Sequence, residues 1–147
     1  MMRDFRYSDR CVVDSKHVVK IVWDRLKPYV PKELFPENKA VGLNERLRFL
    51  RYDKGMYFKS HCDGSYYEKG SNPPKYSMVT LQLYLNKEMK GGATTFMGED
   101  EKKHVAVHPK TGLALLFDHD IEHEGSLLEE GRKYAVRTDV MYEEIQL

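Results

Sequence analysis

Two segments of this chain alternate between apolar and polar residues with the two-residue period of a β-strand. They are residues 78–85 (MVTLQLYL) and 133–142 (KYAVRTDVMY). Their apolar faces hold Val79, Leu81, Leu83 and Leu85 in the first segment and Tyr134, Val136, Val140 and Tyr142 in the second. Because successive side chains of a strand point to opposite faces, each segment can bury one face against a core. The alternation therefore predicts a β-sheet as the main architecture.

Shorter apolar runs extend this pattern along the chain. The strand-like runs are residues 46–52, 105–107 and 113–117. Turn-forming residues gather in the ranges 28–44, 69–75 and 99–103. Many short strands joined by turn-rich loops are typical of antiparallel sandwiches and jelly rolls. We therefore expect a mainly β fold with flanking α structure.

One helix is expected near the N-terminus. Valine and leucine recur at helical spacing between Val18 and Leu26, and Asp14 or Ser15 can cap the first turn. Pro28 is expected to end this helix, because proline disfavours the helical conformation in the residue before it.

The polar faces of the two alternating segments have two interpretations. They can simply be exposed to solvent, as one face of many antiparallel sheets is. Alternatively, they line a water-accessible cavity inside the roll, while the apolar faces pack under the helix. Spacing alone favours the first interpretation.

Charge and hydrophobicity exclude some classes of partner. The net charge of the 147 residues is +1 and no basic stripe stands out, so no nucleic acid is expected as a partner. No apolar run is long enough to cross a bilayer. The charged N-terminus lacks a signal core, and two cysteines make no disulfide framework, so we expect a cytoplasmic or nuclear protein.

The segment 58–64 (FKSHCDG) contains candidate metal ligands. On an extended strand His61 and Asp63 point the same way and can reach one ion together. His123 lies 62 residues later and can complete the set from another strand. Two imidazoles and one carboxylate match the facial triad of non-haem Fe(II) oxygenases, which keeps coordination positions open. Each histidine alone is more often a surface or packed residue, and that is the interpretation we give His119.

Five segments taken together give the pattern its specificity. They are RYDKGMYFKSHCDG, VTLQLYLN, GGATTF, HPKTGLALLFDHDIEHEG and GRKYAVRTDVMY, in this order along the chain. In this order they resemble the catalytic core of the prolyl 4-hydroxylase-like 2-oxoglutarate/Fe(II)-dependent oxygenases. The resemblance implies a double-stranded β-helix, a cupin-like jelly roll, that holds Fe(II) by His61, Asp63 and His123. It implies a single catalytic domain over residues 1–147, with a core at about 46–142 and a short helical N-terminal support.

The resemblance also implies a cation for the far carboxylate of 2-oxoglutarate. In this family a basic residue stands ten positions after the second histidine, and here that residue is Lys133. Arg137 lies four positions further on the same face. It can bind that carboxylate instead, share it, contact an anionic group of the substrate, or form an ordinary salt bridge with Asp139 or Glu143. We assign the cosubstrate to Lys133, with Arg137 as the alternative.

Three further residues match positions that surround the cosubstrate in the family. Tyr52 precedes His61 by nine residues, Tyr84 ends the segment VTLQLY, and Thr94 belongs to GGATTF. Tyrosine and threonine are also common sheet residues, so each has a plain structural alternative. The segment 64–75 is expected to form a mobile loop over the site.

The activity implied is hydroxylation of a C–H bond by a dioxygenase that uses Fe(II), 2-oxoglutarate and O2, with ascorbate as reductant. A peptidyl residue such as proline is the expected target. A small molecule or another side chain is an alternative substrate. A catalytically silent jelly-roll binding module and a zinc site built from the same ligands are alternatives of other classes. The oligomeric state is open.

Overall fold

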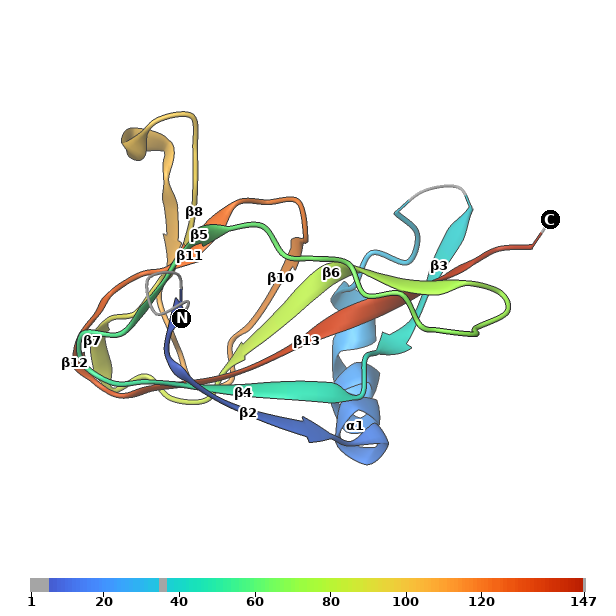
Figure 1. Ribbon diagram of the computed structural model, residues 1–147, viewed down its shortest axis with the longest axis horizontal. Coiled ribbons are helices and arrows are strands. Elements are labelled where there is room, and N and C mark those ends of the chain that lie inside the picture. The colour runs from blue at the N-terminus through green and yellow to red at the C-terminus, as the bar shows by residue number, and fades with distance from the viewer. Residues whose placement is uncertain (1–5, 35–36, 147) are drawn as a thin grey trace.

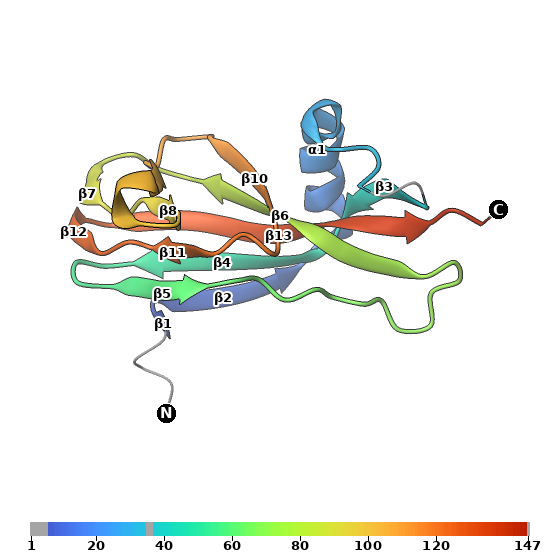
Figure 2. The ribbon, with the colours of Figure 1, turned by 90° about the horizontal axis from the view of Figure 1, so that it is seen from above.

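The structure is a computed structural model that describes residues 6–34 and 37–146. Within these ranges the chain forms two larger antiparallel sheets, one two-stranded sheet and one α-helix. Figures 1 and 2 show the five-stranded sheet over one end of the six-stranded sheet and α1 at the other end. The mainly β jelly-roll architecture expected from the alternation is confirmed.

The six-stranded sheet carries the two alternating segments side by side. Its order is β10 (Ala114–Asp118), β6 (Lys75–Tyr84), β13 (Lys133–Glu144), β4 (Arg46–Tyr52) and β2 (Asp9–Asp14), and β3 (Asn38–Leu43) pairs with the far part of β13. Strand β13 therefore lies at the centre and pairs with β3, β4 and β6. Its residues determine the character of both faces of this sheet.

The five-stranded sheet is built from shorter strands. Its order is β1 (Arg6–Tyr7), β5 (Tyr57–His61), β11 (His123–Gly125), β8 (Thr94–Phe96) and β9 (Val105–Val107). Strands β12 (Leu128–Gly131) and β7 (Met89–Gly91) form the two-stranded sheet. Two 3-10 helices complete the elements, η1 (Lys27–Tyr29) and η2 (Glu101–Lys103).

Helix α1 (Lys16–Leu26) begins where the capping residues predict it. The side chain of Ser15 accepts a hydrogen bond from the N–H of Val18 at 3.2 Å, which satisfies one donor of the first turn. The α-helix ends at Leu26, and Pro28 lies inside η1 rather than after the last turn. A proline fits there because the first turn of a helix requires no N–H from it.

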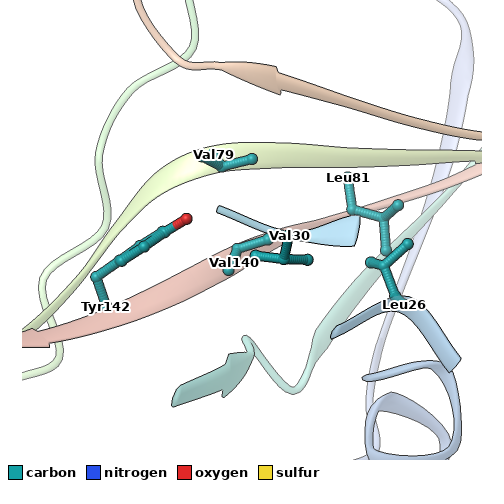
Figure 3. Close-up of a cluster of buried hydrophobic side chains, with 6 residues drawn as sticks. All are labelled: Leu26, Val30, Val79, Leu81, Val140 and Tyr142. Atoms are coloured by element: carbon teal, nitrogen blue, oxygen red, sulfur yellow. The ribbon is translucent and has the colours of Figure 1, made fainter. Parts of the chain in front are cut away.

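The apolar face of the six-stranded sheet packs under α1. One buried cluster joins helix, turn and sheet, and its members are Leu26, Val30, Val79, Leu81, Val140 and Tyr142 (Figure 3). The hydroxyl group of Tyr142 donates to the carbonyl oxygen of Pro31 at 2.9 Å, so the polar end of this ring also has a partner. Burial of this cluster fixes the helix on the sheet.

The opposite face of the same sheet is polar and yet buried. Thr80 and Tyr84 of β6 are 0% exposed, and Lys133 and Asp139 of β13 are at most 2% exposed. This face lies against the five-stranded sheet, where Phe117 of β10 contacts the His123 ring at 4.6 Å between centroids. The interpretation of simple solvent exposure is therefore wrong, and the polar residues line the inside of the roll.

The N-terminal part contains more strand than the sequence indicated. Residues 9–14 form the edge strand β2, and β3 lies within the range 28–44 that was expected to be a loop. The support before residue 46 is therefore not only helical, because β2 pairs with β4 and β3 pairs with β13. In the described part of the chain, no helix is long and apolar enough to span a membrane.

We expect Leu81→Ala to lower the free energy of unfolding by about 2–5 kcal/mol, because Leu81 is 3% exposed and its truncation leaves a cavity under α1. Urea denaturation measures this change. Leu127→Ala is the matched control, since Leu127 is 49% exposed and its loss should change stability by no more than about 0.5 kcal/mol. Equal effects of the two substitutions would contradict the assignment of the core.

Candidate metal centre and adjoining cavity

His61, Asp63 and His123 meet between the two sheets. His61 of β5 and His123 of β11 are directly opposite each other in an antiparallel pair, with ring centroids 4.4 Å apart. Asp63 follows β5, and its Oδ1 lies 3.4 Å from His61 Nε2 and 3.7 Å from His123 Nε2. Their potential ligand atoms all lie within 4.8 Å of one another. The structure thus brings together the three residues that the sequence nominated.

Backbone carbonyl groups orient both imidazoles. His61 Nδ1 lies 2.7 Å from the oxygen of Lys59, and His123 Nδ1 lies 2.9 Å from the oxygen of Ile121. A carbonyl oxygen only accepts, so each Nδ1 carries the hydrogen and each Nε2 offers a lone pair toward Asp63. This is the arrangement of a metal-binding histidine whose other nitrogen is held by the protein.

The carboxylate of Asp63 has one oxygen held and one oxygen available. Oδ2 accepts a hydrogen bond from Thr80 Oγ1 at 2.6 Å. Oδ1 is buried and has no hydrogen-bond partner among the described residues. An unsatisfied buried oxygen is costly, and a divalent cation coordinated by Oδ1 and the two Nε2 atoms would remove that cost. The residues present therefore fit a divalent metal ion.

Asp63 belongs to a directed chain of hydrogen bonds behind the centre. Thr80 donates to Asp63, so the His119 Nδ1 at 2.9 Å donates to Thr80 Oγ1. His119 Nε2 then accepts from Ser77 Oγ at 2.9 Å, and Ser77 Oγ accepts from the N–H of Tyr66. The His119 carbonyl oxygen also accepts from the N–H of Asp63. His119 is thus a packed residue, as expected, but it also holds a candidate ligand in place.

Charges near the centre favour an ionised carboxylate. Burial raises the pKa of Asp63, but the charge of Arg137 and the hydrogen bond from Thr80 hold it well below its ordinary value. Burial lowers the pKa of His123 and that of His119. At neutral pH the candidate ligands Asp63 and His123 are therefore in the deprotonated forms that metal coordination requires.

Lys133 lies in the same cavity with two tyrosines around it. Its Nζ is 4.6 Å from the centroid of the Tyr52 ring and 5.7 Å from that of Tyr84. Lys133 is 1% exposed, and burial lowers its pKa to about 8 without a carboxylate from the described residues to oppose this. A buried ammonium group without an anion is expensive, so this end of the cavity fits an anionic ligand.

Thr94 lines the cavity with Lys133, and Tyr84 is a close neighbour of both. The hydroxyl groups of Tyr84 and Thr94 are hydrogen-bonded to each other, and Gln82 Nε2 donates to Thr94 Oγ1 at 3.0 Å. Burial raises the pKa of Tyr84, which keeps its phenol protonated. Four of the five expected cosubstrate residues, Tyr52, Tyr84, Thr94 and Lys133, therefore lie together.

Arg137 lies at the metal end of the cavity instead. Its Nη1 is 3.2 Å from Asp63 Oδ1, and its Nη2 is 3.6 Å from Asp139 Oδ1. The salt bridge with Asp139 is one of the alternatives that the sequence left open. Contact with Asp63 was not expected, because nothing in the sequence indicates which carboxylate a strand residue will meet across the roll.

Several residues that line or support the site were not expected from the sequence, among them Ser77, Thr80, Arg10 and Arg48. The alternation of VTLQLY was a usable signal for Thr80, since it places this residue on the same face as Tyr84. Arg10 could not be found in this way because β2 was not recognised as a strand.

The segment 64–75 does not line the cavity. It folds back on itself through hydrogen bonds of Glu68 to Lys75 and of Ser77 to Tyr66. Figure 2 shows it reaching past β3, toward the far end of β13 and away from the five-stranded sheet. The expectation of a loop over the site is wrong, because the register of the start of β6 carries this segment outward.

Comparison with known proteins gives one family. The family model described as the 2OG-Fe(II) oxygenase superfamily matches residues 47–138. The probable prolyl 4-hydroxylase 11 of Arabidopsis thaliana is 31% identical over 117 residues, which are 76% of this chain and 37% of that protein. This chain therefore spans about a third of the length of this curated relative.

Solved structures share the fold at low sequence identity. A Pseudomonas putida prolyl-4-hydroxylase matches 99% of this chain and 76% of its own, with a TM-score of 0.68 and 17% identity. A Trichoplax adhaerens prolyl hydroxylase, solved with a hypoxia inducible factor peptide fragment, matches 95% of this chain and 65% of its own, with a TM-score of 0.69 and 17% identity.

We expect Thr80→Val to weaken divalent metal binding by about 10- to 100-fold, because it leaves Asp63 Oδ2 and His119 Nδ1 without their shared partner. Titration with Mn²⁺ measures this affinity. Thr95→Val is the matched control, since the Thr95 hydroxyl is hydrogen-bonded to Ser126 rather than to a candidate ligand. Unchanged metal affinity in Thr80→Val would show that the chain of hydrogen bonds does not position Asp63.

Proposed function

The chain belongs to the 2OG-Fe(II) oxygenase superfamily, and from this premise we propose that it is a 2-oxoglutarate- and Fe(II)-dependent dioxygenase. One observation carries the proposal. Three candidate ligands, His61, Asp63 and His123, converge at one end of a cavity, and the buried ammonium group of Lys133 lies at the other. Among the described residues, Asp63 Oδ1 has no hydrogen-bond partner and Lys133 has no carboxylate near it.

His61, Asp63 and His123 would hold Fe(II) in this proposal. Three protein ligands leave positions open for the cosubstrate and for O2. Arg137 then loses Asp63 as its full counter-ion, because that carboxylate shares its charge with the metal. Thr80 keeps the second carboxylate oxygen occupied, which favours coordination through Oδ1 alone.

Lys133 would pair with the far carboxylate of 2-oxoglutarate. It is the better candidate than Arg137, because Arg137 already faces Asp63 and Asp139, whereas Lys133 has aromatic rings as its close neighbours. The phenol of Tyr84 and the hydroxyl of Thr94 would complete the polar end of this pocket. The rings of Tyr52 and Tyr84 exclude water from the ion pair and so strengthen it.

The bound metal and cosubstrate supply the oxidation, in which 2-oxoglutarate and O2 give succinate and CO2 and a C–H bond becomes C–OH. The protein's own residues bind, orient and exclude water. No side chain of the cavity is required as a nucleophile. The proposed reductant that restores Fe(II) is ascorbate.

The proposed prime substrate is a peptide, with proline as the target residue. The prolyl hydroxylase of Trichoplax adhaerens was solved with a peptide fragment, and the Arabidopsis thaliana relative is named a probable prolyl 4-hydroxylase. A small molecule or another side chain remains the alternative substrate. A silent binding module is disfavoured because the three ligands and Lys133 are all present. A zinc site would leave the buried cation unexplained.

The proposal covers the chain as one catalytic domain with its core at about residues 46–142. Cys11 and Cys62 are both free and exposed. Free thiols agree with the proposed cytoplasmic or nuclear location.

We expect the protein to release succinate from 2-oxoglutarate when supplied with Fe(II) and ascorbate. His61→Ala should abolish this turnover. Lys133→Ala should weaken 2-oxoglutarate binding by 100-fold or more, because an ion pair in a dry pocket is lost, and Arg137→Ala should weaken it far less. Absence of both turnover and 2-oxoglutarate binding in the wild type would refute the enzyme, and loss of affinity only in Arg137→Ala would move the anchor to Arg137.

The affinity for 2-oxoglutarate should fall as pH rises above about 8, because the Lys133 ammonium has its pKa lowered to about 8 by burial. The loss approaches tenfold per pH unit. Calorimetric titration with Mn²⁺ in place of Fe(II), from pH 6.5 to 9.5, measures it. Lys133→Arg is the control, since a guanidinium does not titrate in this range. An affinity of the wild type that stays constant to pH 9.5 would contradict the assignment.

The lowered pKa of Lys133 also affects the stability of the ligand-free protein. Between pH 8 and 10.5 the unfolded chain keeps a proton on Lys133 that the folded protein has lost. Stability therefore gains from rising pH in this window, since the unfolded state binds more protons. Because the charged ammonium group is costly to bury, Lys133→Met should raise the melting temperature of the ligand-free protein at pH 7. The same substitution should abolish cosubstrate binding.

A further inference from the structure

Three arginines from three adjacent strands face the cavity. They are Arg10 of β2, Arg48 of β4 and Arg137 of β13, and all three line it together with His61 and His123. Arg48 and Arg137 are directly opposite each other in the β4–β13 pair. Arg10 is opposite Leu50, two residues from Arg48 and on the same face. The strand register thus gathers three guanidinium groups beside the metal centre.

Within residues 6–34 and 37–146, the carboxylates near these arginines are too few to balance them. In this part of the chain Arg48 is near Asp139 alone, at 3.9 Å, and Arg137 shares that residue at 3.6 Å. Arg137 also contacts Asp63, which the proposed function assigns to the metal. Among the described residues that line the cavity, Glu124 is the one acidic residue, and it accepts a hydrogen bond from Ser126.

The other arginines of β4 show how the same two strands form ordinary ion pairs. Arg46 lies 3.2 Å from Asp14, and Arg51 lies 2.7 Å from Asp9, so both receive a carboxylate from β2. Directly opposite Arg48, β2 instead supplies Val12, and the next residue of β2 on that face is Arg10. Arg48 therefore has Arg137 directly opposite and Arg10 diagonally opposite, and the described carboxylate near it is Asp139 at 3.9 Å.

This arrangement costs stability in the free protein. Like charges directly opposite each other in a sheet repel. Burial lowers the pKa of Arg48, and the charge of Arg137 lowers it further, with a smaller contribution from Arg10. Arg137 Nε is also buried with no hydrogen-bond partner among the described residues. One buried guanidinium donor and an excess of positive charge are thus left in the cavity that His61 and His123 also line.

We propose that the prime substrate is an acidic peptide, whose Asp or Glu side chain is bound by Arg10 and Arg48 while the target residue lies at the metal. This inference rests on the proposed function and adds the chemical class of its substrate. A carboxylate placed between Arg10 and Arg48 would reduce the repulsion between the guanidinium groups and accept hydrogen bonds from them, as in other Arg–carboxylate pairs. An acidic peptide fits better than nucleic acid, because the arginines form a small cluster and the chain's net charge is only +1.

A set of synthetic peptides tests the inference. Each peptide has one proline in a Gly/Ser background and one variable residue, which is Asp, Asn or Lys, placed in turn at each of the four positions on either side. Binding to the protein loaded with Mn²⁺ and 2-oxoglutarate is measured by fluorescence anisotropy. At the preferred position, Asp should bind at least tenfold more tightly than Asn and more tightly still than Lys, and salt should reduce the difference.

Substitutions of single arginines then show which of them bind the acidic side chain of the peptide. Arg48→Gln and Arg10→Gln should each reduce the preference for Asp over Asn to less than threefold. Arg48→Glu should turn the preference toward Lys. Arg51→Gln is the matched control, because Arg51 is on the same strand but is paired with Asp9 on the outer face, and it should keep the full preference.

The outcomes separate this inference from the proposed function. If the wild type binds 2-oxoglutarate and releases succinate but binds Asp, Asn and Lys peptides equally, or binds none of them, the acidic substrate is wrong and the oxygenase stands. A single-stranded oligonucleotide that binds more tightly than every Asp peptide would also overturn it. Loss of 2-oxoglutarate binding itself would refute the proposed function.

Discussion

Burial of the Lys133 ammonium group is the constraint around which the inside of the roll is arranged. Lys133 lies on the central strand, opposite Tyr52 of β4, and the ring of Tyr84 of β6 covers its other side. Without a carboxylate among the described residues, these rings provide its closest electrostatic contacts. The free protein thus holds a destabilised cation ready for an anion, and its hydrophobic core under α1 must offset that cost.

The metal end of the cavity follows a different principle, in which backbone and polar side chains prepare the ligands. The oxygens of Lys59 and Ile121 fix the two imidazoles, and Thr80 fixes the carboxylate of Asp63. Little conformational freedom is left to lose when a metal binds, which favours affinity and a single geometry. Arg137 belongs to the same polar face of β13 as Lys133, but it contacts the candidate ligand Asp63.

The main strands, the helix and the pair His61 and Asp63 could be predicted from sequence, because alternation, capping and the spacing of this pair are local signals. His123 is distant in sequence, and its assignment as the third ligand gained its specificity from the flanking segments. Lys133 required a family resemblance, since spacing alone does not indicate a buried cation. The link from Ser77 through His119 to Thr80 could not be predicted, because it joins segments whose approach depends on the packed roll. Strand β2 was missed because all its residues are exposed and give no core signal. The contact of Arg137 with Asp63 depends on how the two sheets face each other.

Because β13 is the central strand, its register determines which residues enter the core and which line the cavity. A slip of one residue against β4 or β6 would turn the face of β13 that carries Arg137 and Asp139 toward the core side of the sheet and bring Val136 into the cavity. Such a chain would bury unpaired charges in place of its core and could not remain stably folded. A misregistered molecule would therefore be open to proteolysis instead of persisting as inactive protein. The alternation of this one strand thus links correct folding to an intact cavity.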